Sequence, residues 1–244
     1  MKFTSIVLFS VLGVLSCQGQ ASAASSSGID CGKKLSKLEK QICTSAELKT
    51  LDAAMSTTYA TALTKVSRPD DLMRIQKNWL DQRSEQGGYL VKAYKLHIKW
   101  LESLSAGAAL DSRLGKYAYG ACPDAAEGTN NSAKGCKHPA ENSMYLLPEG
   151  VGKVRVSIES IFMNGHTCGY EGVGTWSSAR KLIVKDSSEM NLTECTLEVS
   201  VKGEKAETKL ISADPSEPCR PMYCGMNGTL DDTFYLLKSN FPVK

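Results

Sequence analysis

The chain of 244 residues lacks the sequence patterns that mark common catalytic sites. It has no G-x-S-x-G nucleophile elbow, no H-E-x-x-H zinc motif, no phosphate-binding glycine loop and no C-x-x-C redox pair. Only three histidines are present, and we expect His97 to face solvent because its predicted helix is otherwise basic. Carboxylates are plentiful, but none stands out as a paired acid and base. We therefore expect no enzymatic activity, no catalytic residues and no cofactor.

The chain also lacks an apolar run long enough to cross a bilayer, and it lacks a concentrated basic patch with interleaved aromatic residues. The formal net charge is only +3, with a mildly basic first half and a mildly acidic second half. Solvated faces account for these charges. We therefore expect no transmembrane span and no nucleic-acid partner.

An apolar run of residues 3–15 follows Met1-Lys2 and is typical of a cleavable export signal. The small residues Ala21-Ser22-Ala23 predict a signal of residues 1–23, a linker of residues 24–28 and a soluble mature protein. Leu15-Ser16-Cys17 offers an alternative lipoprotein signal of residues 1–16, in which Cys17 carries the lipid. Leu15 is unusual in such a box, so we favour soluble release.

Eight cysteines lie outside the targeting segment, and an even number in an exported chain predicts a disulfide framework. These are Cys31, Cys43, Cys122, Cys136, Cys168, Cys195, Cys219 and Cys224. We expect Cys31 to pair with Cys43, and Cys122 with Cys136, because each pair flanks a short segment. The other four allow three connectivities, and the sequence does not choose among them. His166 and Cys168 could also form half a zinc site, but disulfide pairing is the stronger interpretation, and we expect no metal.

Residues 29–105 show helical periodicity. Thr44-Ser45-Ala46-Glu47 resembles a capping box, and apolar residues then recur at three- and four-residue steps. Pro69 is expected to end the first long helix, with Asp70-Asp71 capping the next, and Gly87-Gly88 to mark a further break. Short helices require mutual packing, so we predict a small disulfide-pinned helical bundle.

Residues 106–244 alternate between apolar and polar positions, as strands do. The clearest runs lie at residues 154–159 and 195–201, with shorter ones at 182–184, 208–211 and 234–237. Turn residues separate these runs, so we predict a β-rich antiparallel sandwich or barrel that contains the remaining disulfides. The predicted fold class is therefore α+β.

The first region resembles the LprI-type lysozyme inhibitor family of exported bacterial proteins over residues 29–104. The motifs that carry the resemblance are Asp30-Cys31, Glu39-Lys40-Gln41-Ile42-Cys43, Glu47-Leu48, Leu51-Asp52, Tyr59, Gln76-Lys77-Asn78-Trp79-Leu80, Arg83, Leu90, Tyr94, His97-Ile98 and Leu101. The resemblance implies a helical fold in a periplasmic protein, or an outer-membrane-attached one if Cys17 is lipidated. We expect five of its motif residues to have a mainly structural role: Trp79, Arg83, Leu90, Tyr94 and Ile98. For Trp79 and Arg83, packing in the core or bridging to a neighbouring helix is the favoured interpretation over partner binding.

Two functions fit these features. The protein could bind a lysozyme or another wall-degrading enzyme and block its cleft, because a cationic, hydroxyl-bearing loop can pair with catalytic carboxylates. Residues 176–181 have that chemistry, with Ser178, Arg180 and Lys181 as candidate contacts, although an ordinary strand edge with solvated cations is the simpler interpretation. Alternatively, the protein is an envelope immunity or structural module without activity on lysozyme.

Overall fold

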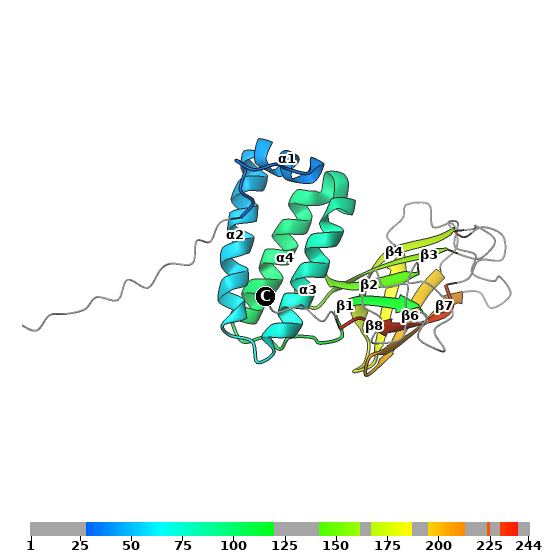
Figure 1. Ribbon diagram of the computed structural model, residues 1–244. Coiled ribbons are helices and arrows are strands. Elements are labelled where there is room, and N and C mark those ends of the chain that lie inside the picture. Colours follow the sequence, from blue (N-terminus) through cyan, green and yellow to red (C-terminus); the bar gives the residue numbers. More distant parts are fainter. Residues whose placement is uncertain are drawn as a thin grey trace, which may run out of the picture.

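The computed structural model describes residues 28–119, 142–161, 167–186, 195–212, 224 and 230–238. Helices come first, and strands follow (Figure 1). The helices are α1 (Lys37–Thr44), α2 (Ala46–Leu63), α3 (Pro69–Gln82), the 3-10 helix η1 (Arg83–Tyr89) and α4 (Leu90–Ser105). The strands are β1 (Gly115–Tyr119), β2 (Ser143–Pro148), β3 (Val154–Ile161), β4 (Thr167–Trp176), β5 (Lys181–Asp186), β6 (Cys195–Lys202), β7 (Lys205–Ser212) and β8 (Asp232–Leu236). The predicted signal, Cys17 and most of the linker lie outside the described residues.

Local chemistry sets the helix boundaries, with two differences from the predictions. The capping box is formed by Ser36 and Glu39 at the start of α1, whereas Ser45 alone caps α2 through the amide of Leu48. Thr44 does not cap α2, because its hydroxyl donates to carbonyls within α1. Pro69 begins α3 rather than ending α2, which already stops at Leu63, since proline suits a first helical turn.

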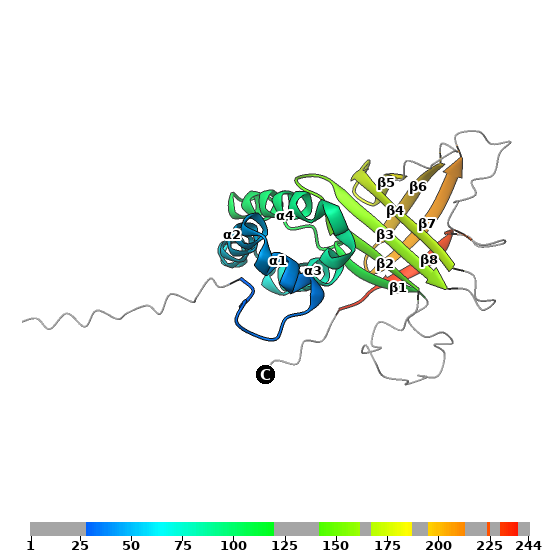
Figure 2. The ribbon, with the colours of Figure 1, turned by 90° about the horizontal axis from the view of Figure 1, so that it is seen from above.

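The break before α4 is located where the two glycines predict it. Gly87, which lies within η1, has a positive φ of 46° and non-helical backbone angles, so the chain kinks there before α4 begins. The turn returns α4 along α2, against which it packs extensively, while α1 crosses the end of the longer helices (Figures 1 and 2). The buried positions of α4 include the motif residues Leu90, Tyr94 and Leu101, and Ile98 is half-buried.

The second region is a closed eight-stranded antiparallel barrel, in which each strand pairs with the next along the chain and β8 pairs with β1. Of the two predicted alternatives, sandwich and barrel, the barrel is therefore the one present. The predicted alternations correspond to β3 and β6, whose inward residues are buried. Closure through the pairing of Tyr117 with Leu236 leaves no open sheet edge.

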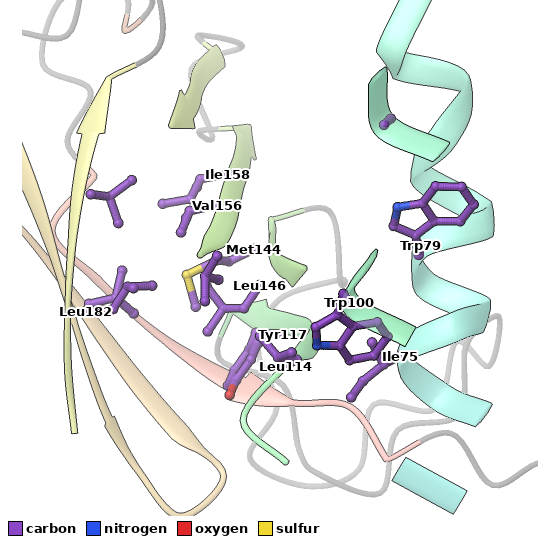
Figure 3. Packing of buried hydrophobic residues seen from close by; sticks show 14 of the residues in the cluster. Ile75, Trp79, Trp100, Leu114, Tyr117, Met144, Leu146, Val156, Ile158 and Leu182 are labelled. Atoms are coloured by element: carbon purple, nitrogen blue, oxygen red, sulfur yellow. The ribbon is translucent and has the colours of Figure 1, made fainter. Parts of the chain in front are cut away.

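One continuous apolar core runs from the helices into the barrel (Figure 3). α3 packs against β1 and β2, and Ile75 of α3 is fully buried. Tyr117 and Met144 occupy the barrel side of the same cluster and are also fully buried. The helices and the barrel thus meet through a packed seam rather than through a free linker.

Candidate functional site

The turn between β4 and β5 consists of residues 177–180, all of them exposed. Its backbone is closed by the Ser177 amide, which donates to the carbonyl of Lys181 at 2.8 Å, and the Ser177 hydroxyl donates to the same oxygen at 3.0 Å. On the other side, the Val201 amide of β6 donates to the carbonyl of Arg180 at 2.7 Å. The turn is therefore fixed from within and from the neighbouring strand.

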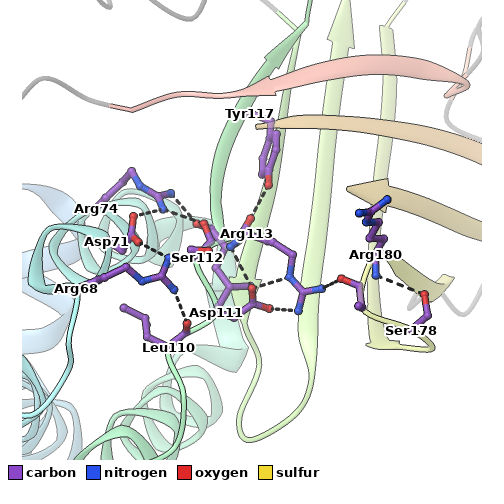
Figure 4. Close-up of polar contacts among 12 residues, drawn as sticks. Arg68, Asp71, Arg74, Leu110, Asp111, Ser112, Arg113, Tyr117, Ser178 and Arg180 are labelled. Atoms are coloured by element: carbon purple, nitrogen blue, oxygen red, sulfur yellow. Dashed lines mark hydrogen bonds and ion pairs between the residues drawn. The ribbon is translucent and has the colours of Figure 1, made fainter. Parts of the chain in front are cut away.

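The three predicted contact residues have different surroundings. The Arg180 amide donates to the Ser178 hydroxyl at 3.4 Å, so the two residues lie at the same tip (Figure 4). Lys181 forms an ion pair with Glu198 at 3.0 Å, which offsets its charge. The Arg180 guanidinium forms no ion pair with any residue that the structure describes. Arg180 is accordingly the cation of this turn that is available to a partner.

Arg113 braces the turn from the side of the helices. Its guanidinium carbon lies 3.4 Å from the ring centroid of Trp176, and one nitrogen donates to the carbonyl of Ala179. Asp111 holds the same guanidinium by two hydrogen bonds of 2.7 and 2.8 Å, the geometry of a bidentate pair. A planar cation fixed in this way stacks on the indole and binds the turn at once.

The segment that carries Arg113 is itself fastened to α3 (Figure 4). Arg68 donates to the carbonyl of Leu110 at 3.0 Å. Arg74, which is buried, donates to the carbonyls of Leu114 at 2.6 Å and Ser112 at 3.2 Å. The carboxylate of Asp71 pairs with both arginines, at 3.4 and 3.1 Å. Asp71 was expected to cap α3, but its side chain serves this anchor instead, and α3 has no side-chain cap.

The family-motif residues gather inside the helical region. Arg83 reaches across to α2, where it lies 3.4 Å from an oxygen of Asp52, and it also donates to the Tyr94 hydroxyl at 3.0 Å. The Tyr94 hydroxyl donates to Asp52 at 2.7 Å, as does the amide of Ile29. Burial and the Asp52 carboxylate raise the pKa of Tyr94, so the phenol stays neutral. Arg83 thus bridges neighbouring helices and Trp79 is buried, in agreement with the favoured interpretation.

His97 differs from the prediction. It is fully buried, with its ring stacked on Trp79 at 4.0 Å and its Nε2 2.7 Å from the amide oxygen of Gln76. The prediction failed because His97 lies on the buried face of α4, three residues after Tyr94 and four before Leu101, and its ring and that of Tyr94 both contact Trp79. Burial, reinforced by the charge of Arg155, lowers the pKa of His97 to about 3.

Two disulfides lie wholly within the described residues. The predicted bond between Cys31 and Cys43 is present and ties the segment before α1 to its last turn. Cys168 is bonded to Cys224, which selects one partner among the connectivities left open by the sequence, and Cys195 is also disulfide-bonded. Cys122, Cys136 and Cys219 lie outside the described residues, as does His166.

Comparison with protein-family models, curated proteins and solved structures gave no match to this chain. Within the described parts of the chain, no group of three or more His, Cys, Asp or Glu side chains is placed to hold a metal ion. No helix there is both long and apolar enough for a membrane span. The function must therefore be argued from the geometry of the turn and its support.

The sequence suggested Ser178, Arg180 and Lys181 as candidate contacts, but it did not point to the residues that support the turn. Arg113 contacts a turn that lies 66 residues further along the chain, and no periodicity predicts such a contact. Asp111 and Arg113 stand two residues apart in a connecting segment, a spacing too common to carry information alone.

Proposed function

We propose that this protein is an exported envelope protein that binds another protein through the β4–β5 turn, residues 177–180. The partner we propose is a lysozyme or another wall-degrading enzyme, whose cleft the turn blocks. The observation that carries the proposal is an exposed, internally hydrogen-bonded turn that presents the Ser178 hydroxyl and the Arg180 guanidinium and is braced by Arg113. The protein is on this view a binder and not an enzyme.

The chemistry of the turn suits an acidic cleft. Glycosidases that cleave walls use a pair of carboxylates on either side of the scissile bond. A guanidinium without an ion pair can form charge-assisted hydrogen bonds with a carboxylate, and a neighbouring hydroxyl can add one more. A turn that is already ordered loses little conformational entropy on binding, and this raises its affinity. Occupying both carboxylates would exclude the substrate.

We further propose that the helical region belongs to the LprI-type family and forms a disulfide-pinned helical bundle at residues 29–105. Support comes from the motif residues, because Trp79, Arg83 and Tyr94 pack together and the Cys31–Cys43 bond pins α1 beside them. Disulfides persist in oxidising compartments, which supports export to the periplasm, or attachment to the outer membrane if Cys17 is lipidated.

The second candidate function is an envelope immunity or structural module. The burial of Trp79 and Tyr94 favours it, because the residues shared with the family then offer no surface to a lysozyme. On this alternative the helices serve as scaffold, and the partner is a different envelope protein.

The test is a titration of the full-length oxidised protein against several lysozymes, read by direct binding and by wall lysis. Arg180→Ala should weaken inhibition at least tenfold, since truncating one member of a buried charge pair at an interface costs about 2 kcal/mol or more. Ser178→Ala should weaken it less, because only a neutral hydrogen bond is lost. Lys49→Ala is the matched control, as Lys49 is an exposed cation on α2, the helix drawn farthest from the barrel (Figure 1).

Absence of binding to every lysozyme at micromolar concentration would remove the inhibitor function and leave the immunity or structural module. Equal losses for the Arg180 and Lys49 variants would show that only net charge matters, not the turn. Turnover of wall fragments by the protein alone would contradict a purely binding role.

A further inference from the structure

We propose that Arg113 is a positioning residue through which the helical region fixes the conformation of the β4–β5 turn. The inference rests on the proposed function of that turn, because it assigns to Arg113 the task of presenting Arg180 to the partner. Arg113 does so without contacting the partner itself.

The contacts of Arg113 are suited to positioning. Its guanidinium uses one edge for the bidentate pair with Asp111, its face for the Trp176 indole and a remaining nitrogen for the Ala179 carbonyl. These contacts satisfy the cation on the protein, so little of it is left for an external carboxylate. In the turn, the Ala179 carbonyl accepts a hydrogen bond from Arg113, and Trp176, just before the turn, is stacked against the same guanidinium.

Trp176 needs this support. The indole nitrogen is buried and has no hydrogen-bond partner within the described residues, so no polar contact fixes the orientation of the ring. The cation stacked at 3.4 Å is then the directional contact of the indole. Because Trp176 is the last residue of β4, the stacked ring places the Arg113 guanidinium directly beside the start of the turn.

The support extends back to α3. Arg113 lies between Ser112 and Leu114, whose carbonyls both accept hydrogen bonds from the buried Arg74. Arg74 in turn pairs with Asp71. Charge-assisted hydrogen bonds from α3 therefore fix the backbone on both sides of Arg113, and the Arg113 side chain carries the connection on to the Ala179 carbonyl in the turn (Figure 4). The helical region thus contributes to recognition although its own family-motif residues are buried.

The first experiment needs no partner. Amide hydrogen exchange is measured on the full-length oxidised protein and on Arg113→Ala, Arg113→Lys and Arg180→Ala. Arg113→Ala should speed exchange of the Ser177 and Val201 amides at least tenfold while leaving β7 unchanged. Arg113→Lys should not restore protection, because an ammonium lacks the planar fork. Arg180→Ala, which removes only the exposed cation, should leave exchange as in the wild type. Unchanged exchange in the Arg113→Ala protein would overturn the proposal.

The second experiment uses a lysozyme that the wild-type protein binds, in a double-mutant cycle of Arg113→Ala and Arg180→Ala. Each single variant should lose about tenfold in affinity. The loss in the double variant should be much smaller than the product of the two single losses, because Arg113 acts through Arg180. Multiplicative losses would mean that Arg113 contacts the partner directly, and would overturn the positioning role. If no lysozyme binds, the proposed function fails, and the exchange experiment still decides whether Arg113 orders the turn. Should Arg113→Ala fail to fold, Asp111→Asn replaces it, since it releases one edge of the guanidinium.

Discussion

Replacing Asp52 by alanine should be the most damaging single change in the helical region. The carboxylate is 95% buried as a side chain and accepts hydrogen bonds from the Tyr94 hydroxyl and the Ile29 amide, both at 2.7 Å. It is also the only acid that forms an ion pair with Arg83 within the described residues, and the Arg83 side chain is just 11% exposed. Removing it would leave a guanidinium buried without a counter-ion.

The magnitude follows from that burial. Breaking a buried ion pair by removing one partner costs about 3–5 kcal/mol, because the remaining charge keeps its desolvation penalty. Tyr94→Phe removes two hydrogen bonds, the one donated to Asp52 and the one accepted from Arg83, but leaves the ion pair in place, so it should cost less, about 1–3 kcal/mol. Since a domain is typically stable by about 5–15 kcal/mol, Asp52→Ala would consume a large fraction of the total. The double variant Asp52→Ala/Arg83→Ala should be less destabilised than the sum of the singles by at least about 1 kcal/mol.

The assay is urea unfolding of the oxidised protein, followed by the fluorescence of Trp79 and the other tryptophans. Urea is preferable to guanidinium because it is uncharged and does not screen the ion pair. A loss below about 1 kcal/mol for Asp52→Ala, or additive effects in the double variant, would refute the view that Asp52 neutralises a buried charge.

The remaining predictions concern a buried histidine and a disulfide. The pKa of His97 is about 3 in the folded protein and 6.5 in an unfolded chain. Between these values the unfolded state binds more protons than the folded state. The free energy of unfolding should therefore decrease as the pH drops from 6.5 towards 3. The slope from this residue is at most about 1.4 kcal/mol per pH unit, and urea titrations of His97→Gln should lack it. Replacing Cys31 and Cys43 together by serine should cost about 3 kcal/mol, as expected for a loop of 12 residues, and a loss near zero would show that the helix contacts alone pin the segment.

Much of the fold is local enough to be predicted from the sequence. The apolar stripes that place Leu90, Tyr94 and Leu101 on one face follow from helical periodicity, and the alternation in β3 and β6 follows from the pleat. Gly87-Gly88 marks a break because glycine alone adopts a positive φ without strain. Helix starts were less predictable, since Thr44 and Ser45 can both cap a helix, and Ser45 becomes the cap because the Thr44 hydroxyl donates to carbonyls of α1 instead.

The rest depends on contacts between distant parts of the chain. Closure of the barrel requires β1 to find β8, and nothing in either strand's pattern distinguishes that partner from another. His97 has the helical spacing of the buried residues Tyr94 and Leu101, but its polar side chain and neighbouring lysines suggested exposure, and the stacked Trp79 ring supplies the apolar partner that the sequence does not name. Ser178 and Arg180 could be selected by their chemistry, whereas Arg113 could not, because its role arises from a contact across 66 residues.

The seam between the helices and the barrel has charged residues at its edges. These residues can fix the position of the segment from which Arg113 supports the β4–β5 turn. Arg74 is buried there, with its nitrogens bound to the Leu114 and Ser112 carbonyls and to Asp71. An apolar seam would stabilise many relative orientations almost equally, because the hydrophobic effect has no direction. Buried charges, in contrast, recover their desolvation cost only where every partner is in reach, so they penalise displaced orientations. A seam of this kind holds the segment around Leu114 at one position on α3, and a brace that starts from that segment can then fix the turn.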